Sequence, residues 1–201
     1  MEKIKEDPAK YPEIMPEGLA KVFYESKIFK DVQSEAQAIV KILAGREMGL
    51  SPIQSMNTVY ILDSKIGYET KVFLSKLKKS EKYDYEVTFT EKDAKVESAT
   101  VDFFKVTKKD DPNSFIGSSQ FSIYDAARIG LINKTSYKNY PKLMLFYRAA
   151  SNGIKMFCPE ILDGAALVED YIELMPSTQE VEVSLKGEEI KVGEIDEQKG
   201  T

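Results

Sequence analysis

Residues 83–105 read YDYEVTFTEKDAKVESATVDFFK, and this stretch decides the fold. In its first half every second residue is apolar or aromatic, namely Tyr83, Tyr85, Val87 and Phe89. Such alternation is typical of a strand with one buried and one solvated face. The second half predicts a long partner strand, and a third strand is expected at residues 115–121, after a polar loop that contains a proline. Together the three runs predict an antiparallel meander.

Hairpin and helix signals surround the predicted meander. A hairpin is expected with strands at 58–62 and 66–70 around a turn at 63–65. The expected helices cover residues 17–29, 34–49 (capped by Ser34, ended by Gly49, with Pro52 barring its continuation), 71–80 (capped by Thr70), 123–129 (capped by Ser122, ended by Gly130), 141–157 (begun by Pro141 after a loop that reaches Tyr140) and about 161–171. We therefore expect an α+β fold, a small and mostly antiparallel sheet (hairpin plus three-stranded meander) packed against helices.

The outer parts of the chain carry weaker signals. Residues 1–33 read as a loose arm followed by a short helix, residues 34–170 as the core, and residues 171–201 as an acidic, mobile tail without a clear period. At 201 residues the chain suits one domain, and no apolar run reaches the roughly 18 residues of a membrane helix. The polar start lacks the pattern of a secretory signal, so we expect a cytoplasmic protein.

The residue inventory argues against most enzyme classes. The chain has no histidine, which excludes Ser-His-Asp and Cys-His catalysis, and its single cysteine, Cys158, excludes an internal disulfide and a multi-cysteine zinc site. Cys158 is expected to be a small buried residue. No stretch matches a phosphate-binding or dinucleotide-binding glycine loop, and no pair of carboxylates stands out. We expect no enzyme, no ATP and no dedicated cofactor or metal site.

Charge is distributed unevenly along the chain. The net charge of −5 arises from residues 171–201, which hold eight acids and three lysines, so that the rest of the chain is neutral. Within that neutral part, residues 126–159 contain no acid and six bases: Arg128, Lys134, Lys138, Lys142, Arg148 and Lys155. Since binding depends on local fields more than on the total charge, this stretch is a candidate for contact with a polyanion.

The predicted helix at 141–157 gives the acid-free stretch a geometry. On a helical wheel one arc gathers the apolar residues Leu143, Phe146, Tyr147, Ala150, Gly153, Ile154 and Phe157. Arg148 and Lys155 fall on the opposite side, and Lys142 lies at its edge. Such a face can neutralise a phosphate backbone, although a basic helix face is most often only a solvated surface. In the loop before the helix, bases and aromatic residues interleave at Asn133, Lys134, Tyr137, Lys138 and Tyr140, a pattern suited to stacked bases.

Five motifs follow one another in order along the chain: AGREMGLSP at 44–52, VYILDSKIG at 59–67, FSIYDAARIGL at 121–131, YKNYPKLMLFYRA at 137–149 and PEILDG at 159–164. Together they resemble the RecT/Red beta family of phage single-strand DNA annealing proteins. Their order and gaps are compatible with the family over residues 34–170. Two departures stand out: Tyr137 replaces the usual tryptophan of the family, and the chain is shorter than typical members.

The resemblance implies an ATP-independent activity, the binding of single-stranded DNA and the annealing of a complementary strand in phage recombination, with a divalent ion only as an aid to annealing. It implies side-by-side subunits in rings or helical filaments, a cognate exonuclease or host single-strand-binding protein as partner, and a phage-encoded protein in the bacterial cytoplasm. It also places DNA contacts at Lys142, Arg148 and Lys155, with Lys65, Lys71 and Lys76 as weaker candidates. Two alternatives stay open: a phage structural or scaffold protein that self-assembles without DNA, and a nuclease.

Overall fold

The computed structural model describes residues 16–62, 64–106 and 114–174, and the fold class is the expected α+β. The expected arm at residues 1–15, the loop at 108–113 and most of the acidic tail lie outside the described residues. Two three-stranded sheets are present, a meander in the order β3-β4-β5 and a mixed sheet in the order β1-β2-β6. None of the helices within these ranges is long and apolar enough to cross a membrane.

The meander is confirmed strand by strand. Its strands are β3 (Tyr83–Lys92), β4 (Lys95–Lys105) and β5 (Phe115–Ser122). All pairing is antiparallel, with Val87 opposite Val101 and Val101 opposite Ser119. The alternating apolar residues make its inner face, where Val101 and Phe103 are fully buried. The hairpin is also confirmed, as β1 (Val59–Leu62) and β2 (Lys65–Tyr68).

The helices follow the expected order, with three additions and several shifted ends. The expected helices appear as α1 (Pro16–Glu25), α2 (Glu35–Glu47), α4 (Thr70–Lys79), α5 (Ile123–Arg128) and α7 (Pro141–Phe157). Ser34 and Ser122 cap their helices through side-chain bonds to the backbone N–H groups of Gln37 and Asp125, as expected. Thr70 is not the cap of α4, because Glu69 takes that position and the Thr70 hydroxyl lies unpaired inside the fold.

Two stretches between the expected helices and strands are helical. Pro52 begins a new helix, α3 (Pro52–Thr58), with a full capping box between Ser51 and Gln54. Between α5 and α7 lie a short 3-10 turn, η3 (Leu131–Asn133), and a helix, α6 (Thr135–Asn139). A first helical position leaves its backbone N–H unused and a proline has none, so Pro52 suits the start of α3.

The last predicted helix divides into three elements. They are a 3-10 turn, η4 (Pro159–Ile161), a two-residue strand, β6 (Ala166–Leu167), and α8 (Val168–Leu174). β6 pairs in parallel with β2, and this contact ties the end of the core to the early hairpin. Helix α8 continues to Leu174, so residues 171–174, which were expected in the mobile tail, are helical.

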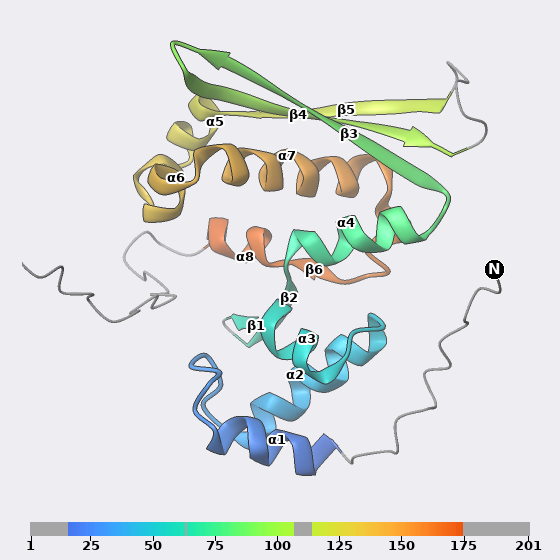
Figure 1. Ribbon diagram of the computed structural model, residues 1–201, viewed down its shortest axis with the longest axis vertical. Helices are drawn as coiled ribbons and strands as arrows, with labels where there is room; N and C mark the ends of the chain where they lie inside the picture. The colour runs from blue at the N-terminus through green and yellow to red at the C-terminus, as the bar shows by residue number, and fades with distance from the viewer. Residues whose placement is uncertain (1–15, 63, 107–113, 175–201) are drawn as a thin grey trace, which may run out of the picture.

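The layers explain how α7 is held. Helix α7 crosses the inner face of the meander, and α4 and α8 lie on the other side of α7 (Figure 1). One large core cluster joins these layers. A second, smaller cluster lies among α1, α2 and α3 at the far end of the molecule. It contains residues before and after position 34, where the sequence predicts the start of the core. In that cluster Lys41, which is 2% exposed, bonds Asp31 at 2.5 Å and the carbonyl of Met56 at 2.7 Å.

Candidate nucleic-acid interface

Helix α7 does not present the basic face that the helical wheel predicted. Arg148 is only 4% exposed, because the side of α7 opposite the meander is covered by other helices. Two charged residues interact with it: burial raises the pKa of Glu169, and Arg148 opposes that rise. Burial and the charge of Arg148 together lower the pKa of Lys134. Arg148 is therefore a buried, partnered guanidinium, and the prediction that it faces solvent is wrong.

Lys155 and Lys142 are accessible in different degrees. The side chain of Lys155 is 34% exposed and its Nζ lies 2.6 Å from Oδ1 of Asp170 on α8. The side chain of Lys142 is 56% exposed; it pairs with Glu91 at 3.0 Å and lies 4.5 Å from the centre of the Phe89 ring. Carboxylates from other parts of the chain, Glu91 and Asp170, thus pair with lysines of the acid-free stretch at 126–159.

The segment before α7 keeps its bases on the surface and one of its two tyrosines, since Tyr140 is 61% exposed. Arg128, Asn133, Lys134 and Lys138 are exposed, and Arg128 pairs with Asp125 at 3.1 Å. Tyr137 is 5% exposed within the core, so the interleaved pattern is wrong at that position. A side chain that packs inside the fold offers no face for a base to stack on.

The three weaker lysine candidates each contact a different residue. Lys65 lies 5.4 Å from the Tyr171 ring centre, and Lys76 is 3.5 Å from Asp163. Lys71 stands at the start of α4 and forms an ion pair with Glu69. Of the three, Lys71 lines the groove described next.

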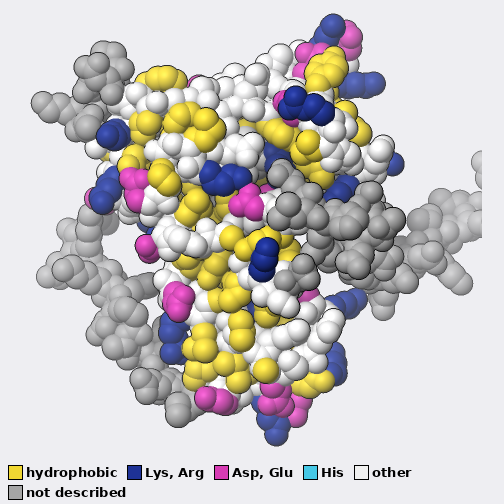
Figure 2. Space-filling model, turned by 180° about the vertical axis from the view of Figure 1, so that it is seen from behind, with side chains coloured by type: hydrophobic (Ala, Val, Ile, Leu, Met, Phe, Trp, Pro, Cys, Tyr) yellow, Lys and Arg dark blue, Asp and Glu magenta, His cyan; other side chains and the backbone are white. Residues whose placement is uncertain are grey.

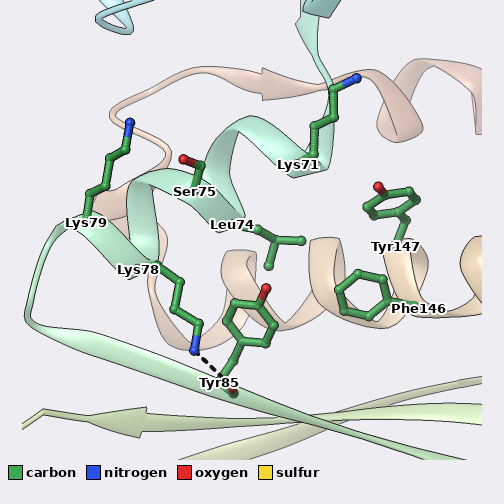
Figure 3. A pocket seen from close by; sticks show the side chains of 8 residues that line it. All are labelled: Lys71, Leu74, Ser75, Lys78, Lys79, Tyr85, Phe146 and Tyr147. Carbon is green, nitrogen blue, oxygen red and sulfur yellow. Dashed lines mark hydrogen bonds between the residues drawn. The ribbon is translucent and has the colours of Figure 1, made fainter.

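That groove is the feature that sequence reasoning missed. It lies between α4, β3 and α7, has a volume of about 520 Å³, and is lined by Lys71, Leu74, Ser75, Lys78, Lys79, Tyr85, Phe146 and Tyr147 (Figure 3). We name it the α4 groove. Its lining contains three lysines and three aromatic residues and no acid.

The aromatic residues of the α4 groove form a continuous wall. The rings of Tyr85 and Phe146 are stacked with centres 6.4 Å apart, and those of Phe146 and Tyr147 are 5.3 Å apart. All three are half-buried, so each keeps part of its surface open to the groove. In Figure 3 these rings and Leu74 lie between the two helices.

The lysines of the α4 groove stand along α4. Lys71 and Lys79 extend away from the rings, whereas Lys78 reaches toward Tyr85 (Figure 3). The Nζ of Lys78 lies 4.5 Å from the centre of the Tyr85 ring, donates to the Tyr85 carbonyl at 3.4 Å, and pairs with Asp84. Among the described residues Lys79 has no ion pair. The spacing of Lys71, Ser75, Lys78 and Lys79 on one helix face is a sequence signal that would have revealed this row.

No protein-family model, no curated protein and no solved structure matches this chain. The fold and the α4 groove must therefore carry the argument about function.

The bases do not form a single ridge on the face of the molecule that Figure 2 shows. On the face seen in Figure 2, Lys and Arg side chains are dispersed among apolar and acidic ones. Within residues 16–62, 64–106 and 114–174 there is also no group of three or more Cys, Asp and Glu side chains placed to hold a metal ion. The α4 groove is thus the place where lysines and open aromatic rings share one lining.

Proposed function

We propose that the protein binds single-stranded DNA in the α4 groove and anneals a complementary strand, without ATP and without breaking a bond. The observation that carries the proposal is the lining itself, where Lys71, Lys78 and Lys79 accompany the open rings of Tyr85, Phe146 and Tyr147. Proteins that hold single strands regardless of sequence combine a positive groove with aromatic platforms.

The arrangement suits a strand that runs along α4. Lys71 and Lys78 are seven residues apart, or about 10 Å at 1.5 Å per residue, the length of about three stacked nucleotides at 3.4 Å each. Phosphates would lie along the lysines and bases would reach the aromatic wall. Lysine acts on phosphate as a point charge and reads no sequence, so a second strand can select its partner by base pairing alone.

Side-by-side copies would extend the groove into a track, as the family resemblance implies for a ring or filament. In that arrangement Lys142, which is exposed near Phe89 of β3, is a further phosphate contact beside the groove. A cognate exonuclease or a single-strand-binding protein would deliver the strands. The proposal requires no dedicated metal site.

The test is a salt titration of oligonucleotide binding by two matched triple variants. Lys71→Ala/Lys78→Ala/Lys79→Ala removes the groove lysines; Lys92→Ala/Lys95→Ala/Lys105→Ala removes three exposed lysines of the meander and changes the net charge equally. We expect the first variant to bind about tenfold or more weakly and to lose about 2 from the slope of log affinity against log salt, since each single-strand phosphate contributes about 0.7. The meander variant should keep the affinity and the salt slope of the wild type.

Annealing is then measured with two complementary oligonucleotides, with and without the protein. Equal loss in both triple variants would refute the α4 groove as the binding site. Failure of the wild-type chain to retard any oligonucleotide would refute DNA binding and favour the self-assembling scaffold protein. Magnesium-dependent degradation of the oligonucleotide would favour the nuclease.

A further inference from the structure

Strand β5 is an open edge of the meander. Within the described residues it pairs with β4 only, so its second row of backbone N–H and C=O groups has no strand partner there. Folded proteins protect such edges with charged residues or proline. Residues 115–122 read FIGSSQFS and contain neither. An edge of this kind is a template for another strand.

A groove runs beside this edge. It has a volume of about 370 Å³ and is lined by Ser118, Ser119 and Gln120 of β5 and by Asn152, Lys155 and Met156 of α7. Its lining has one base, no acid, and a Met156 side chain that is 67% exposed. A strand edge next to a helix is the geometry in which an extended peptide adds to a sheet, because the edge supplies backbone hydrogen bonds and the helix receives alternate side chains.

The acidic tail contains a segment with the matching pattern. Although the tail has no overall period, residues 181–185 read VEVSL, so Val181, Val183 and Leu185 alternate with polar residues. Alternation over a short run without proline or glycine is the pattern of a half-buried strand. In an added strand its three apolar side chains would face α7 and Met156, and its polar side chains would join the polar outer face of the meander.

The chain is long enough to bring this segment to β5. Asp170 of α8 bonds Lys155, which itself lines the groove, so the path of the chain passes along this flank. Helix α8 ends at Leu174, Val181 lies seven residues further on, and an extended chain of that length reaches up to about 23 Å at 3.3 Å per residue. A tether this short gives an effective concentration of order millimolar, which favours the segment of the same chain over a separate molecule.

We propose that the groove between β5 and α7 is a strand-acceptor site and that residues 180–186 of the same chain occupy it as a fourth strand of the meander. The contact closes the open edge and draws the acidic tail onto the sheet, on a different face from the α4 groove. The inference goes beyond the proposed function, since it concerns no DNA.

Hydrogen exchange of the full chain without DNA tests the proposal. Val183→Pro removes one backbone donor from the proposed strand, whereas Val192→Pro places the same change elsewhere in the tail and is the matched control. We expect alternate amides of residues 115–122 to exchange about tenfold or more faster in Val183→Pro than in the wild type, and Val192→Pro to match the wild type.

Equal exchange of residues 115–122 in all three proteins would overturn the proposal. So would protection of these amides that grows with protein concentration, because the strand would then come from a second copy. Neither result bears on DNA binding, so this inference and the proposed function can fail separately.

Discussion

Gly153 lets α7 approach the meander closely, and replacing it should move the helix. A Cβ atom built at Gly153 would lie 2.1 Å from Cε2 and 2.5 Å from Cζ of Phe103, and 3.0 Å from Cβ of Ser119. Carbon atoms prefer separations of about 3.5–4.0 Å, so the Phe103 ring would have to shift by more than 1 Å. Phe103 is fully buried and its ring centre lies 5.8 Å from that of Phe157, which leaves it little room.

The expected cost follows from two opposing effects. Overpacking a dense core costs about 1–3 kcal/mol. Alanine in place of glycine within a helix returns about 1 kcal/mol. We therefore expect Gly153→Ala to lower the free energy of unfolding by up to about 2 kcal/mol and the midpoint of thermal unfolding by up to roughly 8 °C.

Gly18→Ala is the matched control, because a Cβ atom at Gly18 of α1 meets no atom within 4 Å. This variant should gain up to about 1 kcal/mol of stability in the same urea and thermal unfolding measurements. In a Phe103→Leu background the penalty of Gly153→Ala should shrink by about 1 kcal/mol or more, since the clashing ring atoms are gone. A Gly153→Ala protein as stable as Gly18→Ala would refute the close packing of α7 on the meander.

Three further perturbations follow from other parts of the structure. Asp31→Ala should cost about 1–3 kcal/mol in urea unfolding, because the ammonium of Lys41, 2% exposed, loses its counter-charge, although Asp31 itself is 45% exposed. A cost near zero would contradict the contribution of this ion pair. Cys158 is fully buried and burial raises the pKa of its thiol to about 11, so at pH 8 a thiol reagent should label it only at the rate of unfolding; immediate labelling would show it accessible. A hydrogen bond to Glu160, together with burial, raises the pKa of the Tyr83 phenol from 10.0 to about 12. The contribution of this contact to the free energy of unfolding is therefore complete below pH 10 and is lost as the pH rises toward 12. Glu160→Gln should return the pKa in a tyrosinate absorbance titration toward 10, and an unchanged titration would contradict the contact.

The parts of the fold that depend on local sequence were predictable. The meander follows from alternating residues, and Ser34, Ser122 and Gly130 mark helix ends through their own side chains or their backbone conformation. Elements that depend on distant partners were not. The strand β6 has two residues and exists because β2 offers it an edge, so no local pattern announces it.

The candidate site was predictable only in its chemistry. Lysines near aromatic residues were expected, and the α4 groove contains such lysines. Of its lining residues, however, only Lys71 was named from the sequence as a candidate DNA contact. Tyr85 and Phe146 come from elements 61 residues apart in sequence, and only the packing of α7 under β3 brings their rings to 6.4 Å. A contact of that separation has no signature in either segment alone.

The failure at Arg148 has a general physical cause. A helical wheel assigns the polar side of an amphipathic helix to solvent, which holds for a helix in an outer layer. Helix α7 is in the middle layer, with the meander on one side and α4 and α8 on the other, so its polar side is also covered (Figure 1). An acid-free stretch then draws its counter-charges from elsewhere, as Lys155 does from Asp170.

The same layering explains why α4 is the better candidate for contact with phosphate. Helix α4 lies on the outside of α7, buries Phe73, Leu74 and Leu77 on one side, and leaves Lys71 and Lys78 exposed on the other. A phosphate backbone binds charges that solvent already reaches, and the buried guanidinium of Arg148 is not among them. Lys71 and Lys78 pair with Glu69 and Asp84, but their side chains are 52% and 48% exposed, so a phosphate can compete for them.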